Sequence, residues 1–178
     1  DDVTLTTNSR EVVGNRIPDL YGSLTNDFRY KGFDLSILTT YSIGGEMHDG
    51  VYGSMMNVGY KGYVWHKNAL RRWQKPGDIT DVPKIMWDQQ IRVTDQDLIN
   101  ASYFAIKNIT LGYTLPKTLT RKLTIERLRV YVQAENLVTW TKYWGFDPEI
   151  SSGATSLGVD RGIYPQARTY TVGVNVSF

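Results

Sequence analysis

The fold is decided by the last ten residues, Thr169-Tyr170-Thr171-Val172-Gly173-Val174-Asn175-Val176-Ser177-Phe178. Large apolar side chains occupy alternate positions, and the positions between them hold only threonine, glycine, asparagine or serine. Because successive side chains of a β-strand point to opposite faces, this period of two predicts a strand with one apolar face and one small, polar face. Such a strand suits a wall between hydrocarbon and water.

The same alternation recurs earlier in the chain and predicts four further strands, at residues 22–30, 33–43, 103–115 and 127–140. Lys31-Gly32, between the first two, is typical of a tight hairpin turn. The polar faces carry charges, which a wet lumen tolerates and hydrocarbon does not. Three of these charged residues are candidates for facing a lumen: Arg29, Arg129 and Glu135. The alternative is that they form paired charges that brace the wall.

The connections between the expected strands alternate between short and long, which is typical of outer-membrane barrels with short periplasmic turns and long external loops. A structureless loop as long as 44–102 would be unusual inside a compact soluble domain. We therefore divide the chain as follows: the end of an extracellular loop (1–20), a β-hairpin of the barrel (21–43), a long extracellular loop (44–102), two barrel strands with a periplasmic turn at 116–126 (103–140), an extracellular loop (141–166) and the terminal barrel strand (167–178).

The lengths of the expected strands also favour a membrane wall, because a tilted transmembrane strand needs about 9–11 residues. Five strands do not close a barrel, and bacterial barrels have even strand numbers from about 8 upward. A free sheet with an apolar face and two open edges would aggregate. The expected fold is therefore all-β, an antiparallel transmembrane β-barrel of which this chain forms about five strands. Aromatic residues are expected to form two rims of the barrel, Tyr30, Phe33 and Phe178 at one end and Trp140, Tyr143 and Trp144 at the other.

The composition excludes several other classes of function. Twenty basic residues balance 18 acidic ones, so no strong field points to nucleic acid as a partner. There is no cysteine, and no nucleophile elbow, phosphate-binding glycine loop or zinc motif occurs. We therefore predict no enzyme activity, no catalytic residue and no cofactor.

No metal site is predicted either. Asp95, Asp97 and Asn100 are rich in oxygen but lack the glycine and the spaced glutamate of a calcium loop. His48 and His66 have no carboxylate at a familiar metal spacing and are expected at the surface. Asp147 and Glu149 are interpreted as turn residues around Pro148.

Several strings, in order along most of residues 20–178, resemble the C-terminal segment of SusC/RagA-family TonB-linked outer-membrane transporters. They are Tyr103-Phe104-Ala105-Ile106-Lys107-Asn108-Ile109-Thr110-Leu111-Gly112-Tyr113-Thr114-Leu115-Pro116, Gln133-Ala134-Glu135-Asn136-Leu137-Val138-Thr139, Asp147-Pro148-Glu149, and Tyr164-Pro165 with the closing strand that ends at Phe178. The resemblance implies the last strands of a 22-stranded barrel in the bacterial outer membrane, filled by a plug domain outside this chain. It also implies a SusD-like lipoprotein lid, energy from the TonB complex, and import of an oligomeric nutrient, either glycan or peptide.

The closing strand has a second expected use. Barrel-assembly machinery can pair with an exposed strand edge through main-chain hydrogen bonds and read alternate side chains. The expected assembly signal is the set Tyr170, Val172, Val174, Val176 and Phe178, whose side chains would afterwards face the lipid bilayer.

Aromatic residues in or beside the long loops are candidates for substrate contact, because a ring with a polar tip suits a wet recognition surface. These candidates are Tyr63, Trp65, Trp73, Trp87 and Trp144. The alternative is that the rings pack the loops on themselves or on the lid, as large loops commonly do.

Two other interpretations stay open at this point. A different outer-membrane barrel, of the porin or autotransporter type, would share the strand pattern but not the ordered strings. A secreted carbohydrate-binding β-sandwich would use Trp65, Trp73 and Trp87 as a lectin face and the apolar strand faces as an ordinary core.

Overall fold

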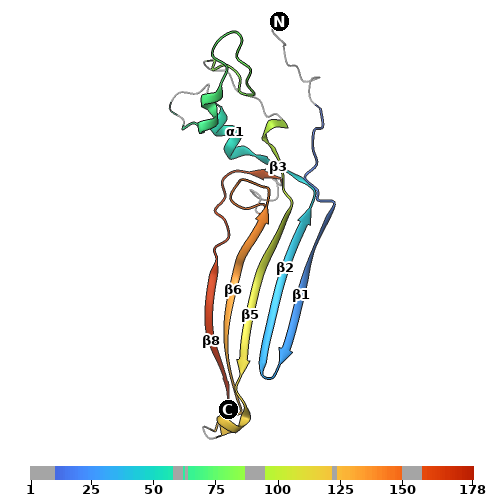
Figure 1. Ribbon diagram of the computed structural model, residues 1–178, viewed down its shortest axis with the longest axis vertical. Helices are drawn as coiled ribbons and strands as arrows, with labels where there is room; N and C mark the ends of the chain where they lie inside the picture. Colours follow the sequence, from blue (N-terminus) through green and yellow to red (C-terminus); the bar gives the residue numbers. More distant parts are fainter. Residues whose placement is uncertain (1–10, 58–61, 63, 87–94, 122–123, 150–157) are drawn as a thin grey trace.

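The computed structural model describes residues 11–57, 62, 64–86, 95–121, 124–149 and 158–178. A long sheet forms one end of the molecule, and a smaller body built from the long connections lies at the other (Figure 1). The long sheet has five antiparallel strands in the order β1-β2-β5-β6-β8. They are β1 (Leu20–Tyr30), β2 (Phe33–Ile43), β5 (Tyr103–Thr114), β6 (Arg127–Thr141) and β8 (Thr169–Ser177). The five strands expected from the period of two are therefore confirmed.

The register of the sheet sorts its side chains into two faces. One row across all five strands is apolar, and consists of Tyr30, Phe33, Tyr113, Val130 and Val174. The neighbouring row is Arg29, Asp34, Gly112, Tyr131 and Gly173, which lie on the opposite face. Large side chains of the apolar face are exposed along its length. The predicted two-faced wall is therefore present.

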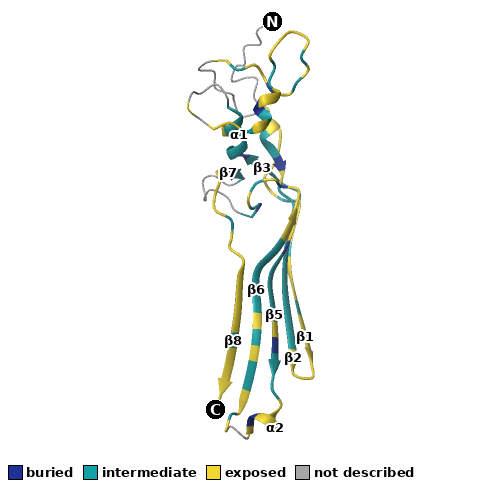
Figure 2. Cartoon of the chain, turned by 60° about the vertical axis from the view of Figure 1, so that its left-hand side comes forward, coloured by how far each residue is buried: buried dark blue, intermediate teal, exposed yellow. Residues whose placement is uncertain are grey.

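Both edges of the long sheet are open. Figure 2 shows β8 exposed along its length, and β1 at the opposite edge is mostly exposed as well. Unpaired strand edges invite pairing with further strands, and closure into a barrel removes them. The sheet thus has the geometry of a segment of a barrel wall.

Short connections gather at one end of the sheet. The turn Lys31-Gly32, the short helix α2 (Lys117–Thr120) and the C-terminus lie together at the end remote from β3 and α1 (Figure 1). Lys31 and Gly32 have φ angles of 46° and 88°, the positive values that a tight hairpin of this twist requires. A Cβ atom at position 32 would also lie 2.8 Å from the carbonyl oxygen of Thr114, so glycine fits there for two reasons.

Bulges interrupt the alternation within β5 and β6. The register shifts at Lys107 where β5 pairs with β2, and shifts again where β5 pairs with β6. Asn136 on β6 has a φ of 51°, a left-handed conformation that asparagine tolerates better than most residues. Because each bulge inserts an unpaired residue, Lys107 and Asn136 can turn toward each other on the polar face.

The segment 44–102, predicted as a long extracellular loop, contains secondary structure of its own. This segment contains β3 (Glu46–Asp49), helix α1 (Gly50–Met56), 3₁₀ helices at Lys67–Arg71 and Asp95–Asp97, and β4 (Leu98–Asn100). β3 pairs with β4 and also, in parallel, with β7 (Val159–Asp160) from the second long connection. We call the described residues of 44–102 and 142–168 the loop body. Its core contains Met47, Ile99 and Tyr143.

Among the described residues, no helix is long and apolar enough to cross a membrane.

Candidate functional site

The polar face of the long sheet carries a charged pair that spans three strands. Arg129 on β6 reaches across β5 to Asp34 on β2, and its Nε donates a hydrogen bond to Asp34 Oδ1 at 3.0 Å. A second bond joins Arg129 Nη2 to Asp34 Oδ2, so the contact is bidentate. Gly112 lies between them, and a Cβ atom there would overlap the guanidinium group. Glycine at this position therefore lets the arginine lie flat across the sheet.

A second long side chain on this face also lies over a glycine. The ring of Tyr131 occupies the space that a Cβ atom at Gly173 would need, and the guanidinium of Arg129 lies 5.1 Å from the centre of that ring. The distance is within the range of a cation–π contact. Asp34, Arg129 and Tyr131 thus form one connected layer that follows the wall.

The structure places the three expected lumen-facing residues on this same polar face. Arg29 is opposite Asp34 in the register, and Glu135 accepts a hydrogen bond from Gln133 Nε2 at 2.8 Å. Arg129 has the structural partner that the alternative interpretation anticipated. Arg29, Arg127 and Arg129 also line one hollow at the end of the sheet. Their use in lining a transport path stays a prediction. Sequence reasoning missed Asp34 as a partner, because cross-strand pairing over an intervening strand leaves no local signal.

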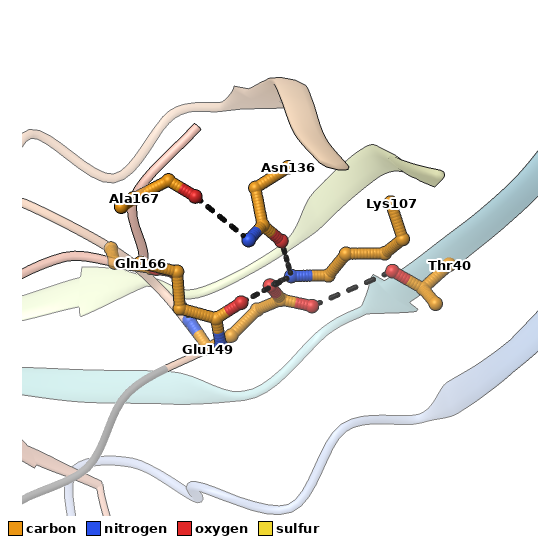
Figure 3. Close-up of polar contacts among 7 residues, drawn as sticks. Thr40, Lys107, Asn136, Glu149, Gln166 and Ala167 are labelled. Atoms are coloured by element: carbon orange, nitrogen blue, oxygen red, sulfur yellow. Dashed lines mark hydrogen bonds and ion pairs between the residues drawn. The ribbon is translucent and has the colours of Figure 1, made fainter. Parts of the chain in front are cut away.

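A second polar cluster joins the sheet to the loop body (Figure 3). Its centre is Lys107, whose ammonium forms an ion pair with Glu149 and hydrogen bonds to Asn136 Oδ1 at 3.4 Å and Gln166 Oε1 at 3.3 Å. Glu149 in turn accepts a hydrogen bond from Thr40 Oγ1 at 3.5 Å. We call Lys107, Glu149, Asn136 and Gln166 the lysine latch, because it links β5 and β6 to the second long connection.

The lysine latch is largely shielded from water. The side chains of Lys107 and Glu149 are 18% and 13% exposed, so the ion pair is screened less than a surface pair. Glu149 N also donates to Asp147 Oδ1 at 3.0 Å, which agrees with the turn interpretation of these residues. That interpretation missed the ion pair. The available signal was a lysine at the place where the alternation of β5 breaks.

Two buried carboxylates organise the loop body. Asp49 caps α1 by accepting from Tyr52 N at 2.8 Å, and its other oxygen accepts from Trp144 Nε1 at 2.8 Å. Asp160 accepts from the hydroxyl of Tyr143 and from Gly162 N at 2.7 Å. Burial and the adjacent Asp160 carboxylate raise the pKa of Tyr143 well above its ordinary value, so this hydroxyl remains a donor.

These contacts correct the expected aromatic rim at the loop end of the sheet. Tyr143 is 5% exposed in the core of the loop body, and Trp144 is bonded to Asp49 there, so neither belongs to a rim on the apolar face. Trp140 does lie on that face, with its ring 5.8 Å from that of Phe104. Tyr143 and Trp144 lie beyond the end of β6, in the expected loop 141–166, and there they pack into the loop body instead of forming a rim.

The candidates for substrate contact are dispersed rather than gathered. Trp144 lies 5.7 Å from Tyr52 at the edge of a hollow in the loop body, whereas Trp65 and Trp73 do not line that hollow. The ammonium of Lys84 covers the ring of Trp73 at 5.7 Å. Tyr63 and Trp87 lie outside the described residues. Sequence reasoning named Trp144 but not Tyr52 as a candidate, because nothing local marks a tyrosine that helix capping brings beside a distant tryptophan.

The histidines are not the surface residues that the sequence suggested. His48 is half-buried in β3 with Nε2 3.7 Å from Asp97 Oδ2, and His66 accepts a hydrogen bond from Asn68 N while its ring meets Tyr52 edge-on. Both are partly buried within the loop body, because β3 and the first 3₁₀ helix pack there. Within the part of the chain that the structure describes, no group of three or more histidine or acidic side chains is placed to hold a metal ion.

The side chains of the expected assembly signal share one exposed face of β8 and its end. They are Tyr170, Val172, Val174, Val176 and Phe178. Their partners on β6 are Ala134, Val132, Val130 and Leu128, in the same order from Tyr170. This geometry meets the requirement for lipid contact, while recognition by assembly machinery stays a prediction.

Comparisons with known proteins match nearly the whole chain. TonB-dependent receptor P3 of Formosa agariphila is 32% identical over 181 residues, covering 98% of this chain and 18% of that receptor. TonB-dependent receptor SusC of Bacteroides thetaiotaomicron is 29% identical over 162 residues, covering 90% of this chain and 15% of its own length. The chain therefore spans less than a fifth of the curated relatives it matches. No protein-family model matches it.

Solved structures give the same result for the fold. The RagAB peptide importer in its closed-closed state superposes with a TM-score of 0.83 at 30% identity, covering 98% of this chain and 19% of that one. The open-open state of the same importer gives a TM-score of 0.78 at 28% identity and the same coverage. The five-stranded sheet and the loop body thus have a counterpart within a much larger solved chain.

Proposed function

This chain is homologous to TonB-dependent receptors of the SusC/RagA type, and we propose that it forms the C-terminal part of an outer-membrane importer for oligomeric nutrients. It is homologous to transporters and receptors rather than to enzymes. In the proposal, the long sheet supplies five strands of a barrel wall and the loop body supplies extracellular surface. The chain makes and breaks no bond.

The observation that carries the proposal is the pair of unlike faces on the long sheet. Exposed apolar side chains cover one face, including Tyr170 and Val172 at 70% and 80% exposure, while charged pairs and glycines follow the other. Lipid stabilises such an apolar face and a wet lumen stabilises the polar one. A secreted carbohydrate-binding sandwich would need a second sheet packed on the apolar face, and none covers it in the described ranges.

The partners follow from the same proposal. The open edges of the sheet would pair with the remaining strands of the same receptor. The polar face would meet a plug domain, whose TonB contact would lie outside this chain. The loop body would meet a SusD-like lipoprotein lid, a relation supported by homology to SusC and to the RagAB importer. A porin or autotransporter is disfavoured because the relatives are TonB-dependent receptors. Glycan and peptide remain the two classes of cargo.

Fractionation of the native membrane tests the proposal. We expect the full receptor in the outer membrane, with a lipoprotein that co-purifies in detergent, and growth on its nutrient that depends on the TonB complex. A receptor that is absent from the outer membrane, or growth that persists without the TonB complex, would contradict the import function.

A further inference from the structure

The loop body contains a hollow to which the proposed import function assigns no ligand. It lies between α1, the 3₁₀ helix Lys67–Arg71, residues 81–83 and Trp144. These segments are distant in sequence and meet at the end of the molecule that carries α1 (Figure 1). In the proposed importer this end faces outward, so the hollow would meet the nutrient before the barrel does.

Two aromatic rings line the hollow with their polar atoms already bonded to protein. Trp144 Nε1 donates to buried Asp49, and Tyr52 Oη accepts from Asn68 Nδ2 at 3.0 Å. The two ring planes are inclined by 54° with centroids 5.7 Å apart, and Trp144 is 64% exposed. The rings are therefore fixed in orientation, and what they offer a ligand is the apolar ring surface. Fixing groups before binding lowers the entropy that binding costs.

The charged groups that line the hollow are Arg71, Asp81 and Asp97, so acidic side chains exceed basic ones there, and Met56, Val82 and Pro83 add apolar surface. Arg71 Nη2 lies 3.2 Å from Asp81 Oδ2, and Asp97 lies beside His48. Gln96 contributes an exposed amide with both donors and an acceptor. The hollow therefore offers hydrogen bonds of both kinds without an uncompensated positive charge.

We propose that this hollow binds a neutral oligosaccharide. The proposal rests on the import function proposed above and names the cargo of the importer. A sugar ring has an apolar C–H face that packs on an aromatic ring, and a rim of hydroxyls that both donate and accept. An acidic glycan would need a free cation, and Arg71 is paired with Asp81. An extended peptide gains affinity by pairing with a strand edge, and the described lining comes from helices and turns, with no residue of β3, β4 or β7.

Binding to the full receptor, purified in detergent with its co-purifying lipoprotein, tests the proposal. The first probe is an array of neutral hexose oligomers, uronic-acid oligomers and peptides, followed by titration with the best-bound neutral oligomer. We expect Trp144→Ala to weaken that binding about tenfold and Trp144→Phe, which keeps a ring, to weaken it less. Trp140→Ala is the matched control, because Trp140 lies on the apolar face of the sheet. The Trp140→Ala receptor should bind the neutral oligomer with unchanged affinity.

A second variant guards against misfolding of the first. Gln96 is exposed, so Gln96→Ala should leave the fold intact and still weaken binding about threefold through loss of a hydrogen bond. Preference for peptides or uronic acids, no binding on the array, or equal affinity of the Trp144→Ala, Gln96→Ala and Trp140→Ala receptors would overturn the proposal. These results would leave the import function standing, because that function is judged by membrane location and TonB-dependent growth.

Discussion

Lys107 lies at the interruption of β5, and its ammonium binds acceptors from β6 and from the second long connection. A residue that kept the alternation would point to one face of the sheet, and its side chain could not contact both β6 and the second long connection. The bulge in β5 therefore lets Lys107 bind the second long connection to the sheet. Removing the lysine would leave Glu149 shielded from water without its cation.

Lys107→Met should lower the free energy of unfolding by about 3 kcal/mol, near the lower end for loss of one partner of a buried pair because some exposure remains. In the intact receptor, trypsin should then cleave at Lys142 and Arg161 faster, since both are exposed in the connection that the lysine latch holds. Arg71→Met breaks the pair with Asp81, whose side chains are 55% and 62% exposed, and should cost less than about 1 kcal/mol. Equal cleavage rates in the two variants would show that the lysine latch does not hold the connection.

Tyr143 gives the loop body a dependence on alkaline pH. Its pKa is raised by burial and by Asp160, so above pH of about 10 the unfolded chain loses this proton while the folded chain keeps it. The unfolded state then binds fewer protons, and the free energy of unfolding falls as pH rises. Tyr143→Phe should be less stable at neutral pH and show a smaller decline above pH of about 10, measured by denaturant unfolding at each pH. A variant with the same alkaline slope as the parent would exclude Tyr143 as the source.

At the scale of the strand, adjacent residues of β8 lie on the apolar face and on the polar face of the sheet. Val172 lies on the apolar face near the middle of the strand and Thr171 on the polar face. Arginine at a lipid-facing position near the membrane midplane costs about 2–4 kcal/mol, whereas a lumen-facing position tolerates it. We therefore expect Val172→Arg to reduce stability in bilayers by that amount and Thr171→Arg to change it little, as measured by urea unfolding of the folded barrel in vesicles. Reversed sensitivities would mean that the faces are assigned the wrong way round.

The strands could be predicted because each contains a run of alternating apolar and polar residues long enough for a period of two to exceed chance, although bulges interrupt that run in β5 and β6. β3, β4 and β7 could not, because strands of two to four residues contain at most one repeat of that pattern. Contacts between distant segments could not be predicted either. The faces of Arg29, Arg129 and Glu135 followed from alternation along each strand. The pairing of Arg129 with Asp34, and of Glu149 with Lys107, depends on how segments distant in sequence are brought together.

At the scale of the whole molecule, the loop body and the open sheet depend on different surroundings. The loop body has a small core of its own around Met47 and Ile99, and buried carboxylates that fix its turns. The long sheet has no layer over its apolar face in the described ranges. In the proposed importer, lipid would cover that face as a second sheet does in a soluble domain, and further strands would pair with its edges. The orientation of the molecule in the membrane then decides which end can meet a nutrient.

Cysteine labelling on intact cells tests that orientation. The chain has no cysteine, and Lys75 in the loop body and Thr118 in α2 are both exposed. The loop body and α2 lie at opposite ends of the molecule (Figure 2). With the long connections outside, a membrane-impermeant maleimide should label Lys75→Cys on intact cells in an otherwise cysteine-free receptor. It should label Thr118→Cys only after the outer membrane is permeabilised, and permeabilised cells thus serve as the control for reactivity. Labelling of Thr118→Cys alone on intact cells would place the loop body in the periplasm, where its hollow could not receive a nutrient from outside.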